Sequence, residues 1–139
     1  MKVVIDTNVL ISGLYFGGVP ARVISAWTEG RTLLVVSPEI LHEYRRVGLE
    51  LAKGRPALIE VLDALLAIVA VHASVVNAPP LATRVSEDPD DDKFLAAALA
   101  SGALLIVSGD RHLLSVSGWN DIVVLKPRQF VDQYLRGDA

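Results

Sequence analysis

Residues 2–8 of the chain read Lys-Val-Val-Ile-Asp-Thr-Asn, a short apolar run that ends directly on an acid. This run predicts a β-strand over residues 2–5, followed by a helix over residues 8–16 that two glycines end. A second apolar run, residues 104–107, is continuous and precedes Ser-Gly-Asp. Continuous apolar strands are typical of parallel sheets that helices cover on both faces. The two stretches together therefore predict an α/β fold.

Strands and helices continue to alternate along the chain. Further strands are expected at residues 33–36, 68–71 and 122–125, although helix and strand are hard to separate at the middle one. Helices are expected at residues 21–29, 38–53, 56–67, 93–101, 110–114 (a short helix or turn) and 127–135. We see no repeat and no linker. The prediction is a single three-layer α/β/α domain, residues 1–139, with a parallel five-stranded sheet.

The composition limits the class of protein. Hydrophobic residues make up 52% of the 139 residues, and the mean hydropathy is +0.44. This excludes intrinsic disorder and predicts apolar surface left over for a homodimer or another partner. The chain has no cysteine, which excludes disulfides, thiolate metal sites and a cysteine nucleophile. The longest apolar run, residues 64–71, is far shorter than the ~20 residues of a membrane span, so we expect a cytoplasmic protein.

The acids are placed where a parallel sheet collects functional groups, at the carboxyl ends of strands. Asp6 directly follows the first strand, and Asp110 follows the strand at 104–107. Glu43 lies early in the helix after the second strand, and an acidic run, residues 88–92, precedes the helix that leads toward Asp110. Carboxylates that converge repel one another unless a cation compensates them. A site of oxygen ligands predicts Mg²⁺ or Mn²⁺, one or two ions, and two would suit phosphodiester cleavage.

Each acid also has a plainer interpretation. Asp6 and Asp110 could cap helices or turns, Glu43 could pair with Arg46, and the acidic run could complement a helix dipole. The net charge of −3 argues weakly against a nucleic-acid partner, but without four metal-site acids the remainder is +1 (−3 + 4). Other α/β enzymes fit less well. A receiver-like phosphotransfer domain needs an acid where Asn8 stands, and the glycine-rich turn of a nucleotide-binding fold is missing.

Four segments resemble the PIN-domain family, and in particular the VapC-like toxins of prokaryotic toxin–antitoxin pairs. Residues 1–10 are similar to the strand that opens this family on Asp-Thr-Asn, and residues 39–44 resemble its helix with a catalytic glutamate. Residues 88–95 followed by 106–114 look like its C-terminal half. The resemblance implies a metal-dependent endoribonuclease of single-stranded RNA, with Mg²⁺ or Mn²⁺ as cofactor and an antitoxin protein as partner. A PIN-like module that binds RNA or protein without cutting is the alternative.

The resemblance also implies roles for individual residues. It assigns catalysis and metal binding to Asp6, Glu43, Asp92 and Asp110, and orientation of these ligands to Asn8 and Ser108. Asp91 competes with Asp92 as the third ligand; Asp92 is preferred because it shares a helical face with apolar neighbours. His112 stands where many relatives have another acid. Lys93 and Arg111, each beside a predicted ligand, are expected to contact substrate phosphates.

Overall fold

The computed structural model describes residues 1–135 and has the predicted α/β architecture. The strands are β1 (Lys2–Ile5), β2 (Leu33–Val36), β3 (Ser74–Val75), β4 (Leu105–Val107) and β5 (Val123–Leu125). The helices are α1 (Thr7–Phe16), α2 (Gly18–Thr28), α3 (Pro38–Ala52), α4 (Pro56–His72), α5 (Asp92–Ser101), α6 (Arg111–Ser115) and α7 (Pro127–Phe130). Short turns of other helical types lie at Pro89–Asp91, Trp119–Asp121 and Val131–Leu135.

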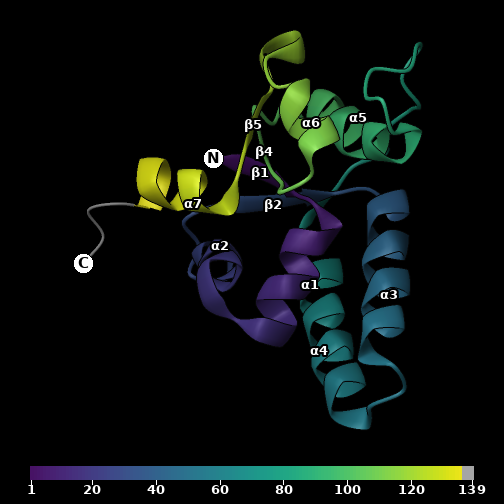
Figure 1. Ribbon diagram of the computed structural model, residues 1–139, viewed down its shortest axis with the longest axis vertical. Coiled ribbons are helices and arrows are strands. Elements are labelled where there is room, and N and C mark those ends of the chain that lie inside the picture. Colours follow the sequence, from purple (N-terminus) through teal and green to yellow (C-terminus); the bar gives the residue numbers. More distant parts are fainter. Residues whose placement is uncertain (136–139) are drawn as a thin grey trace.

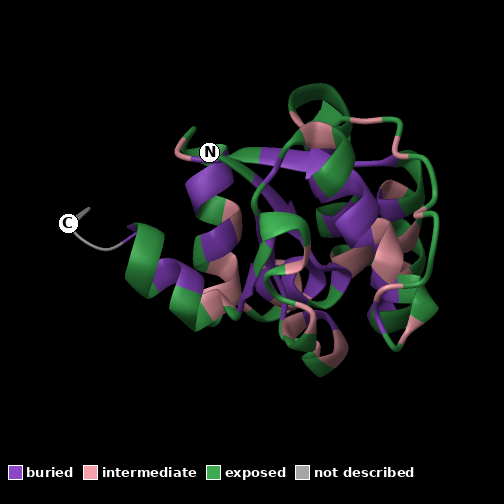
Figure 2. Cartoon of the chain, turned by 90° about the horizontal axis from the view of Figure 1, so that it is seen from above, coloured by how far each residue is buried: buried purple, intermediate pink, exposed green. Residues whose placement is uncertain are grey.

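All the strand pairs of the sheet are parallel, in the order β3-β2-β1-β4-β5. The central strand β1 therefore lies beside β4, although about a hundred residues separate them in sequence. Figure 1 shows α1 to α4 on one side of the sheet and α5 and α6 on the other, which makes three layers. Most residues of β1, β2, β4 and β5 are buried between these layers, as Figure 2 shows, whereas both residues of β3 are exposed. The predicted fold class and its five parallel strands are confirmed.

The prediction of a strand at residues 68–71 is wrong. Those residues complete α4, which runs without a break from Pro56 to His72, and the third strand follows as the two-residue β3. The buried side chains of α4 are Leu62, Leu65 and Val69, which have the spacing of one helical face. The outer face of the same helix is also apolar, so the sequence showed a continuous apolar run instead of a periodic one.

That outer face leaves apolar side chains in solvent. Val61, Ile68 and Val71 of α4 are 43%, 45% and 75% exposed. The composition predicted more apolar surface than one small domain can bury, and these exposed side chains of α4 are such a surface.

Among the described helices, no single one has the length and apolar composition to cross a membrane. Only α1 and α2 together do, and they bend by 100° between them.

Candidate active site

The first carboxylate of the site lies at the carboxyl end of β1. The Asp6 backbone N–H still donates to the Val107 carbonyl of β4 at 2.9 Å, so the sheet itself fixes its position. Its side chain is buried, and Ser108 Oγ donates to Asp6 Oδ2 at 2.7 Å. Ser108 also accepts a hydrogen bond from the Asp110 N–H at 2.9 Å. The predicted role of Ser108 in orienting neighbouring acids is consistent with these two contacts.

Two further carboxylates approach Asp6 from the segments before α5 and after β4. The pKa of Asp6 is raised to about 6, mainly by burial and also by the negative charges of Asp110 and Glu43, while the Ser108 hydrogen bond lowers it. Burial likewise raises the pKa of Asp91 to about 7, with repulsion from Asp110, Asp88 and Asp6. Asp6, Asp91 and Asp110 thus form one electrostatically coupled group, which we call the acid cluster.

Asp92 is not part of the acid cluster. Its two carboxylate oxygens accept hydrogen bonds from the backbone N–H groups of Val85 and Ser86, at 2.9 and 2.8 Å. The side chain therefore anchors the loop that precedes it. The preference for Asp92 over Asp91 is corrected: Asp91 is the buried one, it faces the other acids, and it accepts a hydrogen bond from Ser86 Oγ at 3.4 Å. Leu95 and Ala96, the neighbours that favoured Asp92, are indeed buried. The Asp92 side chain on that face contacts the loop and not the other acids.

Glu43 lies beside the acid cluster, on α3. Tyr44, the next residue, is fully buried and donates from its hydroxyl to the Ile5 carbonyl at 2.5 Å, which holds this turn of α3 against the end of β1. The Glu43 carboxylate accepts a hydrogen bond from Thr7 Oγ1 and forms an ion pair with Lys93 Nζ. Arg46 is 3.8 Å from the same carboxylate, so the predicted ion pair is present as well.

The remaining predicted residues lie around the cluster. Asn8 is exposed and lines an open pocket of about 370 Å³ together with Gly109 and Asp110. Arg111 is exposed in the first turn of α6, and the Asp110 side chain caps that helix by accepting from the His112 N–H at 2.7 Å. His112 itself contacts Glu87 at 3.1 Å.

The sequence interpretation missed two hydroxyl groups that touch the acids, Thr7 and Ser86. Thr7 was noted only as part of an Asp-Thr-Asn segment, and its neighbour Asp6 was the one available signal. Ser86 lies in a loop, and no periodicity marks which loop residues turn inward. Both hydroxyls lower the cost of a buried carboxylate by donating to it.

The donor chemistry of the cluster fits a hard divalent cation. One oxygen of Asp91 and one of Asp110 accept no hydrogen bond from any described residue, and no described cation pairs with Asp6, Asp91 or Asp110. No three Asp, Glu or His side chains among residues 1–135 are already gathered at metal-binding geometry, and Glu43 is paired with Lys93. Burial raises the pKa values of Asp6 and Asp91, and repulsion from neighbouring carboxylates adds to this, so Mg²⁺ or Mn²⁺ would neutralise charge that the described residues leave unpaired.

Comparison with known protein families assigns residues 2–112 to the PIN domain. The chain belongs to the PIN-domain family. The matched range contains every member of the acid cluster together with Glu43. PIN domains are in general nucleases, so the family agrees with an acidic site at the carboxyl edge of a parallel sheet. The chain is also 31% identical to an uncharacterised protein of Methanocaldococcus jannaschii over 145 residues, which cover 96% of this chain and 92% of that protein.

Proposed function

We propose that this PIN domain is a Mg²⁺- or Mn²⁺-dependent endoribonuclease that cleaves single-stranded RNA. The observation that carries the proposal is the acid cluster itself. Three carboxylates from three separate segments lie close enough for their charges to add to the raised pKa values of Asp6 and Asp91, and no described cation neutralises them. Keeping such repulsion in a fold is costly, so it indicates a function that needs the charge.

Within the proposal, Asp6, Asp91, Asp110 and Glu43 hold the metal. A bound divalent ion supplies Lewis acidity and stabilises the charge that develops on a phosphodiester during cleavage. Ser108 and Thr7 orient Asp6 and Glu43 through their hydroxyl hydrogen bonds.

The surface beside Glu43 suits a nucleic-acid strand. An open groove of about 580 Å³ is lined by His42, Glu43, Arg46 and Lys93, among others. Its two cationic side chains, Arg46 and Lys93, are paired with Glu43, and a substrate phosphate next to the acids would compete for them. An open groove admits an extended chain with its bases unpaired, which supports single-stranded RNA as the substrate.

The direct test is cleavage of a mixed RNA pool by purified protein with Mg²⁺ or Mn²⁺, and with a chelator. Metal-dependent cleavage that Asp6→Asn abolishes is the expected result. The matched control is Glu60→Gln, on the exposed side of α4, which should cut RNA at the normal rate. Asn8→Asp is unsuited as a control because it adds negative charge at the site.

A non-catalytic binding module is the second candidate, and the ion pair between Lys93 and Glu43 favours it. A lysine on this glutamate occupies a carboxylate that a metal would use. Calorimetric titration with Mn²⁺ separates the two candidates. Binding of Mn²⁺ that Glu43→Gln weakens supports the nuclease, whereas RNA binding without any metal binding supports the module.

We further propose a cytoplasmic toxin role, with an antitoxin protein and a second copy of the chain as partners. The similarity of residues 1–10 and 39–44 to VapC-like toxins supports it, and the exposed apolar face of α4 supports a protein partner. Induced expression should arrest growth and Asp6→Asn should relieve the arrest. Unimpaired growth with abundant folded protein would remove the toxin role and leave the nuclease intact.

A further inference from the structure

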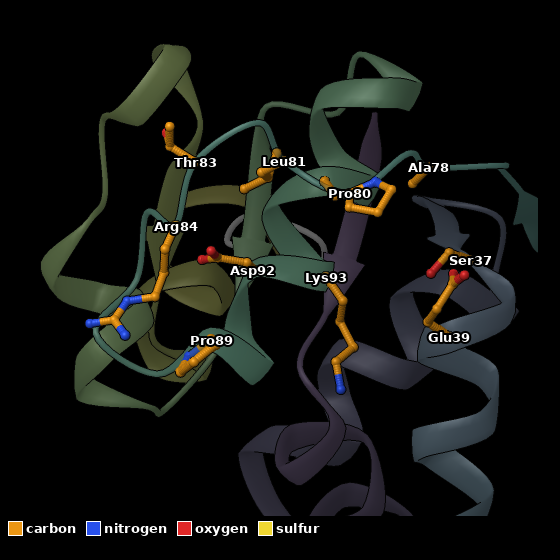
Figure 3. A pocket seen from close by; sticks show the side chains of 11 residues that line it. Ser37, Glu39, Ala78, Pro80, Leu81, Thr83, Arg84, Pro89, Asp92 and Lys93 are labelled. Carbon is orange, nitrogen blue, oxygen red and sulfur yellow. The ribbon is translucent and has the colours of Figure 1, made fainter.

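A second pocket, of about 360 Å³, lies beside the groove and has no part in the proposed metal chemistry. It opens between the start of α3, the start of α5 and the loop segment from Ala78 to Pro89. Figure 3 shows Ser37 and Glu39 together on one side of it, and Arg84 on the opposite side. Pro80, Leu81 and Pro89 give it apolar walls. Its volume is within the range of small-ligand sites, ~300–1,000 Å³.

The pocket is continuous with the groove next to the acid cluster. Glu39 and Lys93 line both of them. On α3, Glu39 precedes Glu43 by four residues, about one helical turn or ~6 Å along the axis. A strand with one phosphate at the acid cluster would therefore bring a neighbouring base to this pocket.

Of the two carboxylates that line the pocket, one is free to bind a ligand. Both oxygens of Asp92 already accept backbone N–H groups. Glu39 is exposed, and no hydrogen bond or ion pair joins it to any residue in the described part of the chain. Beside it, Ser37 Oγ is buried and accepts from the Ile40 N–H at 3.3 Å, while its own proton has no acceptor among residues 1–135.

We propose that this pocket binds a guanine base of the RNA, and that Glu39 selects it; the inference rests on the proposed nuclease function. A carboxylate accepts two hydrogen bonds side by side, and guanine presents two adjacent donors, N1–H and the N2 amino group. Adenine and cytosine present one amino donor beside a ring acceptor, and uracil presents one N–H between two carbonyls. The Ser37 hydroxyl can donate to guanine O6, next to N1. The proline and leucine walls suit the flat faces of an unstacked base.

The test measures binding without cleavage. Guanosine 5′-monophosphate, and separately the adenosine, cytidine and uridine monophosphates, are titrated into ¹⁵N-labelled protein in chelator, and amide shifts are followed. We expect the guanosine nucleotide to bind about tenfold or more tightly than the others, with shifts at Glu39 and Leu81. Glu39→Gln should remove this preference. Glu60→Gln, an exposed acid on α4, should keep it.

Cleavage mapping on an RNA pool gives the second readout. We expect cuts at a fixed distance from guanine in the parent protein, and Glu39→Gln should lose this bias, whereas Glu60→Gln should keep both the bias and the rate. Equal binding of the four nucleotides, or shifts that avoid the pocket, would overturn the inference. So would cleavage without base preference, and in that case the nuclease proposal stands. Guanosine binding at Glu39 in a protein that cuts no RNA would refute the nuclease and leave the guanine pocket in place.

Discussion

The acid cluster and the loop of residues 78–89 lie side by side. Of two aspartates adjacent in sequence, Asp91 belongs to the acid cluster and Asp92 binds the loop. Asp91 faces Asp6 and Asp110, and its charge is opposed by burial and by both neighbours. Asp92 faces the loop, where two backbone N–H groups satisfy its oxygens. Identical side chains one position apart therefore have opposite effects on the fold.

This difference separates function from stability at neighbouring positions. A carboxylate that donors surround stabilises the loop by supplying hydrogen-bond acceptors. A carboxylate with a raised pKa costs folding free energy at neutral pH. Removing the first should harm the fold, and removing the second should help it. Four experiments measure how far the two regions differ.

The largest effect is expected for Asp6→Asn, because Asp6 is the most enclosed acid of the cluster. Metal-dependent RNA cleavage should fall on the order of a thousandfold, since a neutral amide is a poor metal ligand. The free energy of unfolding at pH 8 should rise by about 1–3 kcal/mol, because a buried charge is lost. Urea denaturation and a cleavage assay check both. A variant that is less stable than the parent would contradict the assigned repulsion.

Asp91→Asn and Asp92→Asn form a matched pair that tests the comparison directly. We expect cleavage to fall at least a hundredfold in the first variant and less than tenfold in the second. Stability should change in opposite directions: Asp91→Asn should stabilise, and Asp92→Asn should cost roughly 1 kcal/mol by losing an acceptor for one N–H group. If Asp92→Asn loses activity and Asp91→Asn does not, the original preference for Asp92 is restored.

Ser108→Ala should have a smaller effect, of about ten- to a hundredfold on Mn²⁺ affinity measured by calorimetry, because Ser108 orients Asp6 without binding metal. The same substitution should raise the pKa of Asp6 further, since the lost hydrogen bond favours the charged form. Ser101→Ala, on the far end of α5, is the control. Unchanged affinity in Ser108→Ala would mean that the sheet alone orients Asp6.

The smallest perturbation changes only pH. In the metal-free protein, Asp6 and Asp91 have folded-state pKa values of about 6 and about 7, above the ordinary aspartate value of 3.8. Between about pH 4 and pH 7 the folded state binds more protons than the unfolded state, so stability from these groups falls as pH rises. For Asp6 the loss in the free energy of unfolding is on the order of 3 kcal/mol. Denaturation midpoints at pH 5 and pH 8 should therefore differ less in Asp6→Asn, and Mn²⁺ should restore stability at pH 8.

The sequence predicted the fold well where its patterns were periodic or sharply bounded. The run at 104–107 has Gly102 two residues before it and Ser-Gly directly after it, and these boundaries predicted a strand that the structure confirms as β4. Residues 64–71 offered no such boundary. The exposed face of this part of α4 carries apolar side chains, like its buried face. A helix with two apolar faces has no periodic pattern of polar and apolar residues that would reveal it.

The site was predictable to the level of segments but not of individual atoms. Asp6 and Asp110 follow strands, and the parallel register of β1 and β4 places them at one edge. The choice between Asp91 and Asp92 depends on a helix that begins at Asp92, after a different helical turn at Pro89–Asp91. A shift of one residue there rotates a side chain by about 100°, and sequence patterns locate helix starts less finely than that.

The hydrogen bond between Ser108 and Asp6 joins positions 102 residues apart, across the two central strands. During synthesis, a chain that has made β1, β2 and most of its helices still lacks the partner that sets the first acid. At about 5–20 residues per second, this gap is about 5–20 s of translation. The acid cluster therefore cannot form until β4 has emerged, so the proposed nuclease activity would be delayed until then. The order of the strands thus makes assembly of the acid cluster a late event in synthesis.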